Sequence, residues 1–259
     1  MTTLTERQPV EQHRRAAFRR LLRTEALLFA RTPIAVTWAA LIPVIAFVAL
    51  GCIPALRKAS DDLDGGSYLG AYLPILMAFS LVMSAANLLP PTLALYREKG
   101  ILRRLSTTPV PASWLLAAQA GIFAGVGLVV SVALFAIGIG FGVTVPRQVA
   151  GFVLTLVLLA AATLGLGLLI AAVARTGKAA NAMGFVLFFP LMFLAGLWVP
   201  RPLMPEILRT ISDYSPLGAG VRGLQDSIAG HWPPTQSLLV LIAWAVVTGA
   251  LAVRFFRWQ

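Results

Sequence analysis

The chain has 259 residues, of which 58% are apolar and only 12% are charged. Soluble proteins contain about 45–50% apolar residues, glycine included, and about 25% charged residues, so this composition excludes a soluble globule. A net charge of +11 indicates nucleic-acid binding in a soluble protein, but in a membrane protein it first indicates orientation. We therefore expect an integral membrane protein with no nucleic-acid partner.

The N-terminal segment, residues 1–33, is expected to lie outside the hydrocarbon core as a cytoplasmic segment. Phe18, Leu22, Ala26 and Phe29 recur close to helical spacing, with arginines on an adjacent face. This pattern predicts an amphipathic helix that lies in the membrane interface and ends near Pro33. Two roles fit the pattern equally: a basic anchor for the orientation of the chain, or a docking element for a partner.

Residues 34–259 are expected to form one transmembrane domain that is entirely α-helical. A helix that crosses about 30 Å of hydrocarbon needs about 20 apolar residues. Six stretches are interpreted as spans, and they cover 34–56, 69–92, 114–142, 149–173, 181–199 and 236–253. The single cysteine, Cys52, excludes an intramolecular disulfide and is interpreted as a small packing residue within the first span.

The basic residues alternate between the two sides of these spans. The N-terminal segment, the loops 93–113 and 174–180 and the C-terminal tail together carry fifteen Lys and Arg and four acidic residues. The opposite loops carry six basic and six acidic residues, so the whole net charge falls on one side. Because Lys and Arg concentrate in cytoplasmic loops, both termini are predicted to be cytoplasmic.

A charged segment, LYREKGILRRLSTTPVPASWLL at 95–116, lies between the second and third spans. If 97–105 is helical, Ile101, Leu102 and Leu105 share one face and the basic residues share the other, whereas Glu98 falls on the apolar face. A short amphipathic helix with one carboxylate in its apolar stripe suits docking to a protein surface. The alternative is a solvated juxtamembrane loop whose charges only set the orientation.

This segment resembles the signature of type-2 ATP-binding-cassette (ABC) export permeases, in which R-E-x-G-x-x-x-R-L is followed by T-P-V and a transmembrane helix. A second resemblance lies in FLAGLWVPRPLMPEILRTISDYSPLGAGVRGLQDSIAG, where an apolar span meets proline-rich residues, a short helix and Ser-Pro-Leu. With the six spans, the resemblance covers residues 18–257. It implies a permease in the bacterial cytoplasmic membrane, with short extracellular helices between the fifth and sixth spans. It also implies a second permease chain, as a homodimer, and two separate ABC ATPase subunits.

The resemblance gives candidate roles to two groups of residues. The charged segment becomes a cytoplasmic coupling helix that transmits closure of the ATPase to the spans, and Glu98 is expected to pair with a basic residue of the ATPase. The coupling residues are Arg97, Glu98, Lys99, Gly100, Ile101, Leu102, Arg103, Arg104 and Leu105. The second and fifth spans line the substrate path in similar permeases, and this chain offers Phe79, Met83, Ser84, Asn87, Asn181, Phe185, Phe188, Phe189 and Met192. Aromatic and Met side chains suit flat apolar ligands, although packing against other helices or lipid is the alternative role.

The sequence has no Gly-x-x-x-x-Gly-Lys-[Ser/Thr] loop to hold the phosphates of ATP. We therefore expect a transport subunit rather than an enzyme, with ATP and Mg²⁺ on the partner ATPase and no cofactor or metal on this chain. The expected cargo is a small hydrophobic, drug-like or antibiotic-like molecule moved out by alternating access. A lipid-linked or polysaccharide cargo is the alternative for the same architecture. A membrane-embedded enzyme is disfavoured because all ten acidic residues lie outside the span cores.

Overall fold

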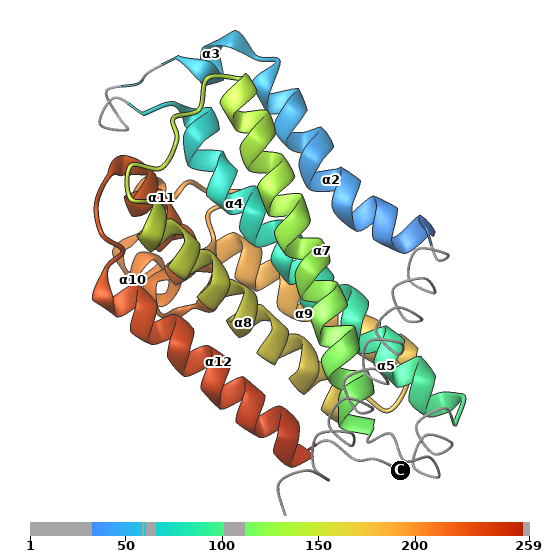
Figure 1. The fold of residues 1–259 in the computed structure, drawn as a ribbon. Coiled ribbons are helices and arrows are strands. Elements are labelled where there is room, and N and C mark those ends of the chain that lie inside the picture. The colour runs from blue at the N-terminus through green and yellow to red at the C-terminus, as the bar shows by residue number, and fades with distance from the viewer. Residues whose placement is uncertain (1–32, 59, 61–65, 101–111, 256–259) are drawn as a thin grey trace, which may run out of the picture.

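The computed structural model describes residues 33–58, 60, 66–100 and 112–255. Within these residues every regular element is a helix, and the helices form an elongated bundle (Figure 1). Five helices are long and apolar enough to cross a membrane, namely Tyr68–Glu98, Trp114–Gly140, Val149–Val173, Gly177–Leu194 and Thr235–Phe255. The chain is therefore an all-α, multi-pass membrane protein. The predicted interfacial helix of the N-terminal segment lies outside the described residues.

The first predicted span is shorter than expected. Helix α2 runs over Pro33–Gly51 rather than 34–56. It ends because a turn at Cys52 leads to Pro54, which has no N–H to continue the helix and instead begins the short helix α3 (Pro54–Arg57). Cys52 is exposed in this turn, so its interpretation as a packing residue is wrong.

The second span is longer than predicted. Helix α4 (Tyr68–Val82), the π-helical segment η2 (Met83–Leu88) and α5 (Leu89–Glu98) form one continuous 31-residue helix instead of ending at 92. Pro90 and Pro91 are tolerated because they fall in the first turn of α5, directly after the π-helical turn has already interrupted the regular α-helical hydrogen bonds. The extension carries Arg97 and Glu98 on the end of a membrane helix.

The other four membrane helices follow the predicted order, and all but α8 have shifted ends. Helix α7 covers Ala112–Gly140, α8 covers Val149–Val173, α9 covers Gly177–Leu194 and α12 covers Thr235–Phe255. Helix α8 has the predicted bounds, whereas α9 begins and ends earlier than the predicted 181–199. It begins earlier because the hydroxyl of Thr176 caps its first turn, accepting a 3.1 Å hydrogen bond from the N–H of Ala179.

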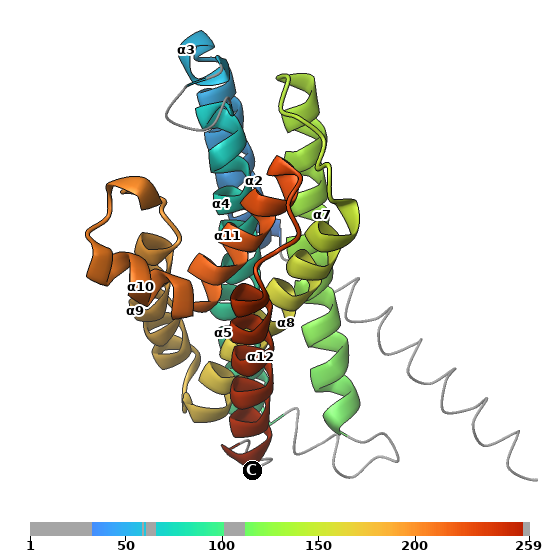
Figure 2. The same ribbon diagram turned by 90° about the vertical axis from the view of Figure 1, so that its left-hand side faces the viewer.

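The second membrane helix is the centre of the bundle. Its apolar window is 78% buried, against 17% for α12. Helix α4 contacts α2, α7, α8 and α11, while η2 and α5 contact α8 and α9. Figure 2 shows α9 and α10 on one side of the molecule and α7 on the other. Any movement of the 31-residue helix would therefore reach most of the other membrane helices.

The segment between α9 and α12 forms the 3₁₀ turn η3 (Arg201–Leu203), α10 (Glu206–Tyr214) and α11 (Pro216–Ala229). Helix α11 is largely buried. The indole of Trp244 on α12 donates to the carbonyl of Tyr214 at 2.9 Å, and the amide of Gln225 donates to the carbonyl of Ala71 on α4 at 3.1 Å. Helix α11 is thus inserted among α4, α8 and α12 and is no simple cap on the bundle.

The predicted coupling helix is not continuous over 97–105. Helix α5 ends at Glu98, and Gly100 has a φ of +65°, a left-handed conformation that ends α-helices and that glycine adopts readily. Arg97 and Glu98 therefore belong to the second membrane helix. The remainder of the predicted coupling helix, 101–105, lies outside the described residues.

Candidate functional site

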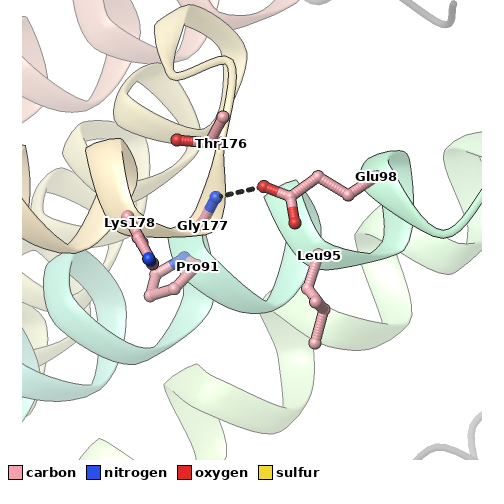
Figure 3. A pocket seen from close by; sticks show the side chains of 6 residues that line it. All are labelled: Pro91, Leu95, Glu98, Thr176, Gly177 and Lys178. Carbon is pink, nitrogen blue, oxygen red and sulfur yellow. Dashed lines mark hydrogen bonds between the residues drawn. The ribbon is translucent and has the colours of Figure 1, made fainter.

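Arg97 and Glu98 lie at the end of α5, beside the turn that joins α8 to α9. The guanidinium of Arg97 donates from Nη1 to the carbonyl of Ala174 at 3.0 Å and from Nη2 to the carbonyl of Ala171 at 3.1 Å. The Oε1 of Glu98 accepts a 2.7 Å hydrogen bond from the N–H of Gly177 (Figure 3). Two adjacent residues of opposite charge thus hold the ends of two different helices.

A groove of about 650 Å³ opens next to this contact. Its lining residues come from α5 and from the start of α9, and they are Pro91, Leu95, Glu98, Thr176, Gly177 and Lys178 (Figure 3). Leu95 is 41% exposed beside this groove. Here the hydrogen bond of Glu98 joins the two helices across an open groove.

The π-helical segment η2 holds a deeply buried amide of the predicted path. Asn87 is 3% exposed, and neither its Oδ1 nor its Nδ2 has a hydrogen-bond partner. Gly184 of α9 lies against this amide, where a Cβ would come within 2.8 Å of Oδ1. Gly167 of α8 lies equally close to η2, since a Cβ there would overlap the carbonyl oxygen of Ala85. π-helical turns are frequent at functional sites, and a buried amide without a partner is rare in folded proteins, so η2 is a candidate functional segment.

The predicted path residues fall into two groups. Ser84, Asn87, Phe188 and Met192 are buried, and Phe79 and Met83 are partly buried. Asn181, Phe185 and Phe189 are exposed on the outer face of α9. The structure therefore does not gather all nine residues around one cavity within this chain.

A run of aromatic side chains links the two groups. The rings of Phe79 and Phe188 meet edge to face with centroids 5.3 Å apart, and Phe188 meets Phe189 in the same way at 5.5 Å. Phe189 then stacks on Trp198 at 6.0 Å. These four rings, which we call the aromatic run, extend from the central helix α4 to the exposed face of α9.

An ionic cluster ties η3, α10 and α11 together. Nη2 of Arg201 lies 2.6 and 2.7 Å from the two carboxylate oxygens of Asp213, and Nη1 of Arg222 lies 3.3 Å from Oδ2 of the same residue. Burial raises the pKa of Asp226, which is on the same helix as Arg222, and the nearby cations oppose that effect only in part. Within the described part of the chain, no three His, Cys, Asp or Glu residues form a metal-binding group.

Sequence reasoning identified Arg97 and Glu98 but missed their partners. The partners are backbone groups of alanine and glycine, which give no side-chain signal. The roles of Gly167 and Gly184 were missed for the same reason. The ionic cluster left a detectable signal, because Arg201, Asp213 and Arg222 are charged residues of both signs in the short segment between the fifth and sixth predicted spans.

Comparison with known proteins decides the family. The model of the ABC-2 type transporter family matches residues 16–228, which is most of the chain. The chain belongs to the ABC-2 type transporter family. Such permeases are the membrane subunits of ABC transporters and act with an ABC ATPase subunit, so the resemblance in the charged segment is confirmed at the level of the family.

Two named members of the family are similar to this chain. The linearmycin resistance permease protein LnrN of Bacillus subtilis is 26% identical over 211 residues, which are 78% of this chain and 52% of that protein. The inner membrane transport permease YadH of Escherichia coli is 28% identical over 173 residues, which are 65% of this chain and 66% of that protein. The aligned parts thus cover between half and two thirds of these ABC-2 relatives.

Proposed function

We propose that this chain is the permease subunit of an ATP-driven exporter that moves small hydrophobic, antibiotic-like molecules out of a bacterial cell. The aromatic run carries this proposal. Its four rings give a flat apolar molecule a series of contacts from the bundle centre to the face of α9. The similarity to LnrN, which is named as a linearmycin resistance permease, supports the same class of cargo.

A second copy of this chain completes the path in our proposal. The outer face of α9 carries exposed Phe185, Val186, Phe189 and, just beyond the helix, Trp198. Helix α10 continues this apolar surface with Ile207 and other exposed side chains. A homodimer that joins two such faces would bring Asn181, Phe185 and Phe189 of both chains to one interface.

The orientation follows from the distribution of charge. The end of the bundle that carries Glu98 and Gly177 is placed in the cytoplasm, because the adjoining loops hold most of the basic residues. The segment around Gly100 then contacts the ATPase, whose closure drives alternating access of the path. In this arrangement ATP and Mg²⁺ bind the ATPase subunits and this chain binds neither.

Co-purification with the ATPase tests the proposed partnership. A tagged copy of this chain, expressed with an ABC ATPase encoded beside it, should retain that ATPase through two purification steps. Its presence should also change the rate of ATP hydrolysis by the ATPase. A chain that purifies alone and leaves hydrolysis unchanged would contradict the proposed role.

A further inference from the structure

Arg97 of α5 contacts the C-terminal end of α8. The last carbonyl groups of an α-helix have no partner within the helix, and they form the negative end of its dipole. With two nitrogens of one guanidinium, Arg97 donates to one of them, at Ala171, and to the carbonyl of Ala174, the residue directly after the helix. A planar, permanently charged group is well suited to this bidentate contact.

Glu98 of α5 contacts the N-terminal end of a different helix, α9. Gly177 is the first residue of α9, and its N–H belongs to the positive end of that helix's dipole. The carboxylate accepts from this N–H at 2.7 Å, whereas Thr176 accepts from the N–H of Ala179 through its own side chain. The first turn of α9 is therefore capped once from within and once by the second membrane helix.

We propose that Arg97 and Glu98 form a clamp that holds the α8–α9 turn to the end of α5 throughout the transport cycle. The cation meets the negative helix end and the anion meets the positive one, so both contacts are favourable. The clamp acts beside an open groove and directly before Gly100, where the helix ends. A displacement of the segment after Gly100 is therefore passed to α5, α8 and α9 together.

This inference rests on the proposed function for its purpose but differs from the expectation that Glu98 pairs with the ATPase. Here Glu98 is a positioning residue whose partner lies 79 positions away in its own chain. The distinction is testable because a clamp can be replaced by a covalent link between α5 and α9. A salt bridge to the ATPase cannot be replaced in that way.

The experiment uses Leu95→Cys and Lys178→Cys, two residues that line the groove from α5 and from α9, in a background with Cys52→Ser. Spin labels on these cysteines report the separation of α5 and α9 in the purified complex. Glu98→Ala should broaden the distance distribution and lower ATP-driven transport about tenfold, the effect of losing one charged hydrogen bond. Arg97→Ala removes two such bonds and should have an effect at least as large. Arg175→Gln removes a cation from the same turn that is not part of the clamp, so it should leave the distance distribution and ATP-driven transport unchanged.

Cross-linking the two cysteines with a short, reducible bifunctional reagent then gives the decisive comparison. In the Glu98→Ala variant the cross-link should restore transport, and cleavage of the cross-link by reduction should abolish this rescue. In the chain with Glu98 intact the link should leave transport unchanged. The clamp is overturned if the distances do not respond to Glu98→Ala, or if the link fails to rescue that variant or blocks the intact chain. Failure of the proposed function has a different signature, because the distances would then respond while the unsubstituted chain shows no ATP-driven transport.

Discussion

Gly184 of α9 lies directly against the side-chain amide of Asn87 on the central helix, closely enough that a Cβ would come within 2.8 Å of Oδ1. Together with Gly167 on α8, this glycine lets the π-helical segment sit between two other membrane helices. The centre of the bundle thus combines the closest helix contacts with an amide that has no partner. Close contact and polar strain at one place indicate a segment under functional constraint.

Replacing Gly167 by alanine should lower the stability of the folded protein by about 2–3 kcal/mol, because the new methyl group overlaps the backbone of Ala85 and a carbonyl group cannot rotate away. Gly249→Ala is the matched control, since a Cβ there meets nothing within 4 Å. It should be neutral or stabilise helix α12 by about 0.5–1 kcal/mol. Thermal unfolding in detergent measures both. Equal effects of the two substitutions would contradict the contact at Gly167.

Replacing Asn87 by leucine should raise stability and reduce transport. Leucine has a similar size and removes an amide that is buried without a partner, a defect that costs about 1–3 kcal/mol. Thr163→Val is the control for stability, because the Thr163 hydroxyl already donates to carbonyl groups of its own helix. A loss of stability in Asn87→Leu would show that the amide has a partner in the folded protein.

Asp213→Asn should destabilise the protein by about 1–3 kcal/mol. It removes the anion between Arg201 and Arg222 and leaves the two guanidinium groups without their shared partner. A double-mutant cycle with Arg201→Met separates the pair's interaction from other losses, and the coupling energy should be favourable. Additive effects of the two substitutions would mean that the pair contributes nothing to stability.

Asp226→Asn should stabilise the protein at neutral pH but not at acidic pH. Burial raises the pKa of Asp226 in the folded state, so the native carboxyl holds its proton to a higher pH than the unfolded one does. The favourable contribution of Asp226 is therefore complete below the unfolded pKa, and it is lost as pH rises through the folded pKa. The gain in melting temperature of Asp226→Asn over the parent should grow with pH across this window. If the gain in melting temperature shrinks as pH rises, the pKa of Asp226 is lowered in the folded protein and not raised.

The family and most of the spans were predictable because long apolar runs and the charged motif can be recognised in the sequence without any knowledge of how the helices pack. Helix α8 has the predicted bounds because its apolar run is closed by Arg147 before it and Arg175 after it. The end of the second span was missed, since Arg97 and Glu98 look like loop residues until their helix-end partners are known. Those partners are backbone atoms 74 to 79 positions away, and no pattern of residue types records them. The helix predicted over 97–105 was also wrong at Gly100, because the helical periodicity of the side chains does not show that this glycine adopts a left-handed conformation.

ATP-driven transport by the purified complex tests the central claim most directly. The chain and its ATPase would be reconstituted in lipid vesicles with the flat apolar dye rhodamine 6G and with linearmycin as cargo. We predict that ATP drives movement of at least one of these molecules, that a hydrolysis-deficient ATPase abolishes the movement, and that Phe188→Ala changes its selectivity between the two. ATP hydrolysis by a stable complex without movement of either molecule would contradict the export of small hydrophobic cargo by this chain.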